Sequence, residues 1–229
     1  MSASIIAAVR KRVGGLTQAS KLAIFVELIL ATGVCFARMF PFSVQIFLLG
    51  FASISLWLRG STWGAVGLRN PKNWFAVFLL ALVFAIAISV IVNLLVGPFV
   101  EHLSGKAPDT SRFGNIRGNL PVLVGWLIVA WTMAGFAEEM FFRGYLMNRI
   151  SDLVGSGRAG WTSALLVSSL LFGLAHGYQG LAGAIGAAEI GLLLGVMYLW
   201  NKRNLWMNIA CHGFIDSISL VSLYLSNAS

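Results

Sequence analysis

Charged residues are scarce in this chain of 229 residues. Lysine, arginine, aspartate and glutamate make up 10% of it, whereas soluble domains carry about 25%. Hydrophobic residues reach 58%, and the mean hydropathy is +0.84. This composition excludes an ordinary soluble domain. It indicates a polytopic membrane protein with a single membrane-embedded domain over residues 1–229.

Cysteine is also rare, and familiar catalytic motifs are missing. Cys35 and Cys211 lie in apolar segments without the spacing of a metal or redox site, so we expect no disulfide framework. The sequence has no His-Glu-x-x-His pattern of the zinc proteases. It also has no Gly-x-Ser-x-Gly nucleophile elbow. We therefore expect no metal and no other cofactor.

Acidic residues are fewer than basic ones, which gives a formal net charge of +8. A basic chain can bind nucleic acid, but here the basic residues flank apolar stretches. They form no stripe interleaved with exposed aromatic residues, as a nucleic-acid groove requires. Basic residues at the ends of spans orient membrane proteins. The expected partner is therefore the lipid bilayer and not nucleic acid.

Seven apolar stretches approach the length of a membrane-spanning helix, which is about 20 residues. They predict an all-α fold, a transmembrane helical bundle of seven to eight spans. An eighth helix could lie in residues 5–19 or 140–153. No strand alternation is long enough for an outer-membrane barrel. The expected spans are Leu22–Ala37, Phe42–Leu58, Trp74–Val96, Leu120–Glu139, Trp161–Gly177, Leu181–Trp200 and Leu205–Leu225.

Twelve of the 16 basic residues fall before the first expected span or after the second, fourth and sixth. The positive-inside rule then predicts a multi-pass cell-membrane protein with a cytoplasmic N-terminus. The polar segment from Pro98 to Pro121 carries glycine, proline, aspartate and asparagine, so we expect a flexible extracytoplasmic loop there.

Three polar clusters interrupt the apolar stretches, although an ionisable side chain at bilayer depth costs a few kcal/mol or more. In the first cluster, Glu139 and Arg143 are spaced i, i+4, so they meet on one helix face if the helix continues. Glu138 then points about 100° away, where it can act as a general base. The structural alternative is that both glutamates are interfacial residues at a helix end.

The other two clusters repeat the i, i+4 spacing. Phe172 and His176 place an aromatic ring one turn from an imidazole, although an interfacial histidine would give the same pattern. His212 and Asp216 share one side of the last expected span, where a purely structural hydrogen-bonded pair is the alternative. Glu189 lies in the sixth expected span and either joins the same cavity or has a structural role.

Together the clusters resemble the CPBP family of intramembrane glutamate proteases. This family is similar to the type II CAAX prenyl endopeptidases and to bacterial proteins of bacteriocin processing and self-immunity. The resemblance covers a catalytic-motif core of about residues 120–225. The family's motifs Glu-Glu-x-x-x-Arg, Phe-x-x-x-His and His-x-x-x-Asn/Asp are met in order by Glu138, Glu139 and Arg143, by Phe172 and His176, and by His212 and Asp216.

The resemblance implies a metal-independent endopeptidase. Glu138, aided by His176, would activate water, and His212 with Asp216 would stabilise the oxyanion. The supporting residues would be Glu139, Arg143 and Phe172. The implied partner is a peptide or protein substrate, either prenylated or bearing a leader.

Two points test this interpretation. The prenyl proteases have asparagine where this chain has Asp216, and an ionised carboxylate cannot donate to an oxyanion. Asp216 is therefore either protonated or orients His212, and we favour orientation. The second point is depth in the membrane. If the helices are upright, His176 lies about 22 Å along its span from Trp161, whereas His212 lies about 10 Å along its span from Leu205. Convergence then requires a tilted or late-starting fifth span.

Two other functions fit the same polar residues. One is a non-catalytic immunity or scaffold protein of the same fold. The other is a proton-coupled transporter, although transporters typically show paired broken helices in two related halves. No such repeat is visible in this sequence.

Overall fold

A computed structural model describes residues 8, 15, 20–36 and 43–226. These residues are helical apart from turns and short connections, and no strand occurs among them. The elements are α2 (Lys21–Phe36), α3 (Ser43–Leu58), α4 (Trp74–Val90), η1 (Ile91–Val96), α5 (Gly97–Ser104), η2 (Ser111–Ile116), α6 (Leu120–Val129), η3 (Ala130–Glu138), η4 (Met140–Leu146), α7 (Met147–Val154), α8 (Arg158–Ala175), η5 (Gly177–Gln179), α9 (Gly180–Trp200) and α10 (Leu205–Leu225).

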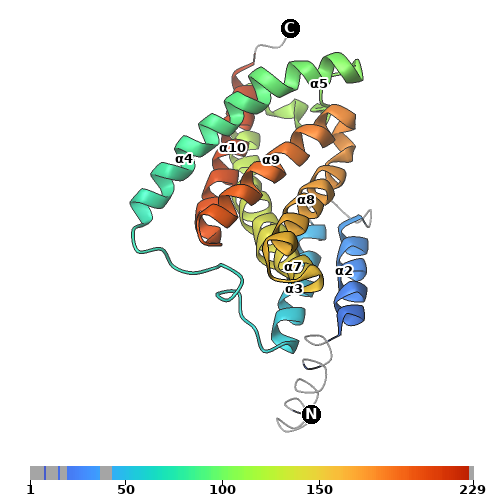
Figure 1. The fold of residues 1–229 in the computed structure, drawn as a ribbon. Helices are drawn as coiled ribbons and strands as arrows, with labels where there is room; N and C mark the ends of the chain where they lie inside the picture. Colours follow the sequence, from blue (N-terminus) through green and yellow to red (C-terminus); the bar gives the residue numbers. More distant parts are fainter. Residues whose placement is uncertain (1–7, 9–14, 16–19, 37–42, 227–229) are drawn as a thin grey trace.

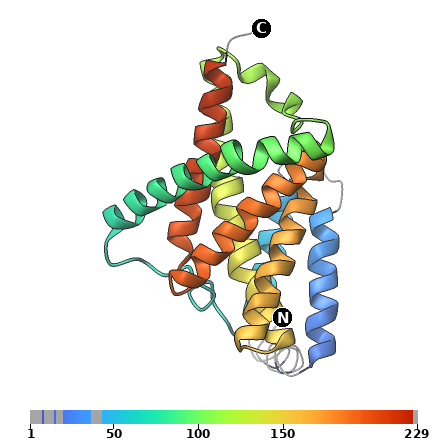
Figure 2. The same cartoon turned by 45° about the horizontal axis from the view of Figure 1, so that its top comes forward.

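The expected all-α polytopic bundle is confirmed. Within the described residues, five continuous helices are long and apolar enough to cross a membrane, and residues 44–58 form a shorter apolar helix. Figure 1 shows α8 and α9 inclined to α10, and in both views α4 crosses the outside of the bundle obliquely (Figure 1, Figure 2). The expected helix in residues 5–19 lies almost entirely outside the described residues.

The longest membrane helix runs without a break from Leu120 to Val154 through α6, η3, η4 and α7. The segment 140–153 therefore continues the fourth expected span and is not a separate helix. η3 and η4 are π-helical, with hydrogen bonds from residue i to i+5. π-Helical turns are rare and occur often at functional sites.

Asparagine residues fix the starts of three of these helices. The side chains of Asn73, Asn119 and Asn204 accept hydrogen bonds from backbone N–H groups in the first turns of α4, α6 and α10. This capping satisfies donors that have no partner within the helix. The caps explain why the apolar runs become helical where they do.

Glycines allow η3 and α10 to pack at close range. A Cβ atom on Gly135 would lie 3.0 Å from the carbonyl oxygen of Ile209, and one on Gly213 would lie 2.8 Å from the Trp131 ring. A larger side chain at either position would push the two helices apart. This contact brings the first and third polar clusters together.

A buried polar network joins α2 to α3, η4 and α7. The Glu27 carboxylate accepts hydrogen bonds from Ser55, from Tyr145 at 2.5 Å, and from Arg149. Arg149 also pairs with Asp152 at 3.2 Å. Glu27 therefore links helices at a distance from the three motif clusters.

The expected flexible loop between Pro98 and Pro121 is wrong in part. Residues 97–104 are α-helical and residues 111–116 form a 3₁₀-helix. Pro98 suits the first turn of a helix, and Gly105 ends that helix in the left-handed conformation. Arg112 stacks over the Tyr178 ring at 4.2 Å, so η2 is docked next to the end of α8.

Candidate active site

The two adjacent glutamates lie at the junction of the π-helical segments. Glu138 is the last residue of η3, and Glu139 stands between η3 and η4. They face different neighbours, because Glu139 bonds to α10 and Glu138 bonds to α3. The sequence predicts this divergence, and the structure identifies the partners on each side.

Glu139 and Arg143 form the expected i, i+4 ion pair. Glu139 Oε1 lies 2.6 Å from Arg143 Nη1, and both side chains are almost fully buried. Arg143 Nη2 also donates to the carbonyl oxygen of Gly191 at 2.9 Å, and its guanidinium lies 4.8 Å from the centre of the Phe172 ring. A buried charge needs such partners, because its desolvation cost is otherwise uncompensated. The pair thus holds η4 against α8 and α9.

Glu139 also fixes the His212 ring. His212 Nδ1 lies 2.9 Å from Glu139 Oε1, and the imidazole is 4% exposed. The carboxylate is ion-paired and can only accept, so Nδ1 is the donor. Asn208, one turn before His212, donates to Glu139 Oε2 at 3.4 Å and to the carbonyl of Leu194 at 2.7 Å. Sequence reasoning missed Asn208, although its i, i+4 spacing to His212 could have indicated it.

The orienting role expected for Asp216 is not what the geometry shows. Asp216 Oδ2 lies 3.8 Å from His212 Nε2, which is an ion-pair distance and too long for a hydrogen bond. Glu139 occupies the other ring nitrogen and sets the ring orientation. The Asp216 side chain is 30% exposed, so it lies at the open side of the cluster. Asp216 can therefore act on the Nε2 proton or on a ligand there.

His176 terminates α8 with its ring turned back over the helix. Its Nδ1 lies 2.8 Å from the carbonyl oxygen of Phe172, so Nδ1 carries the proton and donates. In the neutral imidazole, Nε2 is then the acceptor. The Phe172 ring lies 4.6 Å from the His176 ring and 5.8 Å from the His212 ring, measured between centroids. Phe172 thus packs against both histidines.

Glu138 completes the cluster from the opposite side. Its Oε1 accepts a hydrogen bond from Gln45 Nε2 of α3 at 3.1 Å, whereas its buried Oε2 has no hydrogen bond with the described part of the chain. Glu138 lies within electrostatic range of His212 and Asp216, and Asp216 is within range of His176. All three motifs therefore meet at one place.

The apparent mismatch in depth has a structural explanation. A short turn joins α7 to α8, and distances along both helices can be measured from this turn. At 1.5 Å per residue, Glu138 lies about 24 Å from Val154, and His176 lies about 27 Å from Arg158. α10 begins further from this turn than α8 does, because its first residue, Leu205, packs against Gly144. His212 lies about 10 Å further along α10. The spans are staggered, so the three side chains reach one level.

No hydrogen bond links Glu189 to this cluster within the described residues. Glu189 is half-buried, and its Oε2 makes no hydrogen bond with any residue that the structure describes. Within the described ranges, no group of three or more histidine, cysteine, aspartate or glutamate side chains is arranged to hold a metal ion.

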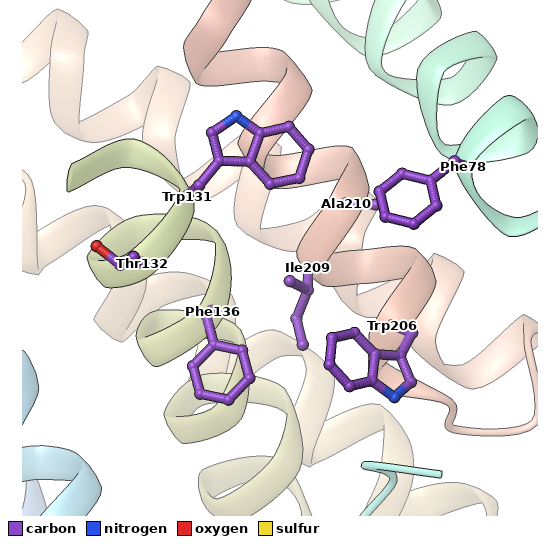
Figure 3. A pocket seen from close by; sticks show the side chains of 7 residues that line it. All are labelled: Phe78, Trp131, Thr132, Phe136, Trp206, Ile209 and Ala210. Carbon is purple, nitrogen blue, oxygen red and sulfur yellow. The ribbon is translucent and has the colours of Figure 1, made fainter. Parts of the chain in front are cut away.

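An apolar hollow of about 410 Å³ lies between α4, η3 and α10. Figure 3 shows the aromatic rings of Phe78, Trp131, Phe136 and Trp206 around Ile209. None of the motif residues lines this hollow. It is therefore distinct from the polar cluster, although η3 and α10 contribute to both.

Residues 120–218 match a family model described as type II CAAX prenyl endopeptidase Rce1-like. Over these residues the chain is similar to the Rce1-like family. The match begins at the first residue of α6 and includes all three motifs, whereas Gln45 lies outside it. No curated protein and no solved structure matches the chain.

The Rce1-like family is a family of proteases, which are hydrolases acting on peptides or proteins. This similarity agrees with the interpretation of the three motifs as a protease signature. The five long apolar helices among the described residues indicate a membrane protein.

Proposed function

We propose that this protein is an intramembrane endopeptidase of the CAAX type that hydrolyses a peptide bond with activated water and without a metal. The observation that carries the proposal is the convergence of three motifs from separate helices. Phe172 contacts both imidazoles, and Glu138 lies within electrostatic range of His212 and Asp216.

Glu138 is the proposed general base. Its Oε2 has no hydrogen bond with the described residues and can take a proton from water as the water oxygen attacks the carbonyl carbon. His176 assists through Nε2, because Nδ1 is engaged with the Phe172 carbonyl. As the carbon–nitrogen bond breaks, the proton is passed to the leaving amine.

His212 and Asp216 are proposed to stabilise the oxyanion. With Nδ1 donating to Glu139, His212 offers Nε2–H to the developing negative charge when the ring carries both protons. Two carboxylates, one on each side, stabilise that cationic ring. Glu139, Arg143 and Phe172 are proposed to support the site by holding the two histidine rings in place.

The charge distribution supports an orientation with the N-terminus in the cytoplasm. The side chain of Arg69 donates to the carbonyl oxygen of Lys202 at 2.5 Å, so basic residues that follow the second and the sixth expected spans lie on the same side of the described bundle. Basic residues of this kind are retained on the cytoplasmic side. The proposed substrate would then be cleaved from that side of a cell membrane.

Purified protein in detergent micelles tests the proposal with a fluorogenic prenylated peptide ending in a CAAX sequence. We expect cleavage that persists in EDTA and 1,10-phenanthroline and is lost in Glu138→Gln. Glu101→Gln is the matched control, because Glu101 is an exposed glutamate of α5. Equal cleavage by Glu138→Gln and wild type would overturn Glu138 as the base, whereas no cleavage by the wild type would overturn the catalytic proposal and leave a non-catalytic scaffold or immunity role.

A further inference from the structure

Gln45 lies in the first turn of α3 and reaches the proposed base from outside the family match. Its Nε2 donates to Glu138 Oε1 at 3.1 Å across 93 positions of sequence. A carboxylate can only accept, and the amide nitrogen is the only donor of a glutamine side chain. The hydrogen bond therefore fixes the orientation of both groups.

The same two groups each present one further acceptor. Gln45 Oε1 and Glu138 Oε2 are both buried, and neither has a hydrogen-bond partner within the described part of the chain. Buried polar atoms are nearly always paired in native proteins. Because Gln45 and Glu138 are hydrogen-bonded to each other, one molecule with two donor hydrogens can bind both of these acceptor atoms. Water is such a molecule.

We propose that Gln45 is a positioning residue that holds the Glu138 carboxylate and offers its amide oxygen as a second acceptor to the attacking water. This inference rests on the proposed function of Glu138 as the general base. It extends the site to α3, which no motif of the sequence includes.

The expected effect of losing Gln45 follows from this geometry. Without the amide, the Glu138 carboxylate is free to rotate, and the water loses one of its two acceptors. Small displacements of reacting groups reduce turnover strongly, so kcat should fall about 10- to 100-fold. KM should change less than about twofold, because Gln45 is proposed to act on the water and not on the peptide.

The experiment compares Gln45→Met, which keeps the side-chain length without polar atoms, with Gln45→Asn, which moves the amide out of reach. Ile46→Met is the matched control, because Ile46 is the next residue of α3 and its side chain is exposed. The prenylated-peptide assay gives kcat and KM, and the unfolding temperature in detergent reports folding. If Gln45→Met does not fold, Gln45→Asn carries the test.

A purely structural role would not show coupling to Glu138. In a Glu138→Asp background the shorter carboxylate is already out of reach, so Gln45→Met should lower kcat no further. An equal loss in both backgrounds would overturn the inference. Wild-type kcat in both Gln45 variants, with Glu138→Gln inactive, would overturn it and leave the proposed function standing. An active Glu138→Gln would remove Glu138 as the general base and with it the premise of this inference.

Discussion

Removing one charge of the Glu139–Arg143 pair should destabilise the protein strongly. Glu139→Gln leaves Arg143 buried with a positive charge and without a carboxylate partner. The Gly191 carbonyl and the Phe172 ring remain beside the guanidinium, but neither carries a charge. Breaking a buried ion pair in this way costs about 3–5 kcal/mol.

The reverse substitution gives a similar cost. Arg143→Met leaves the Glu139 carboxylate buried with only His212 and Asn208 as donors. The double variant removes both charges, while the amide of the new glutamine can still accept from His212. We therefore expect the double variant to lose about 1–3 kcal/mol, less than either single variant.

Unfolding by sodium dodecyl sulfate in mild detergent, followed by circular dichroism, measures these free energies. Glu101→Gln is the matched surface control and should leave the midpoint unchanged, because Glu101 is exposed. If the double variant instead loses the sum of the two single losses, the buried charges do not compensate each other. The account of Glu139 as the centre of this network would then be wrong.

Three further predictions concern packing, the reaction centre and the distant network. Gly213→Ala should destabilise the protein by about 1–3 kcal/mol, because the new Cβ would lie 2.8 Å from the Trp131 ring. Gly125→Ala, with nothing within 4 Å, is its control in the same unfolding assay. Asp216→Asn should lower kcat by less than about tenfold, because the cationic His212 ring loses one of its two carboxylates while Glu139 still orients it; a loss of about 100-fold would restore the orienting role. Glu27→Gln should lower the free energy of unfolding by about 3 kcal/mol and leave kcat unchanged, because its network does not touch the motifs.

The regular features of the site could be predicted from sequence because they follow the helix period. The pairs Glu139–Arg143 and Phe172–His176 are spaced i, i+4, and both make contact in the structure. The apolar runs likewise predict the helical bundle, since few other structures satisfy a backbone in lipid.

The partners across helices could not be predicted in the same way. The spacing places His212 and Asp216 on one face, but it does not show that Glu139 from another helix takes the Nδ1 position. Gln45 is separated from Glu138 by 93 positions and belongs to no recognisable pattern. Long-range pairing of this kind depends on the packing of several helices at once.

The depth of each polar residue could not be predicted for a different reason. An apolar run does not show where its helix starts relative to the neighbouring helices, and α10 starts next to Gly144, in the middle of its neighbour. The polar segment after η1 shows the same difficulty. Its mixture of glycine, proline, aspartate and asparagine indicates a loop, but Pro98 and Gly105 mark the first turn and the end of a short helix.

The π-helical segments η3 and η4 also determine where a one-residue deletion in this helix can be tolerated. A one-residue deletion within residues 130–133 would allow i to i+4 hydrogen bonding and rotate α6 by about 100° relative to the rest of its helix. The spacing of Glu138, Glu139 and Arg143 would be unaffected. A deletion between Glu139 and Arg143 would instead change the spacing of the buried pair from i, i+4 to i, i+3 and alter its geometry. Length variation among related sequences should therefore be found on the α6 side of the glutamates, where it changes only the face that α6 presents to its surroundings.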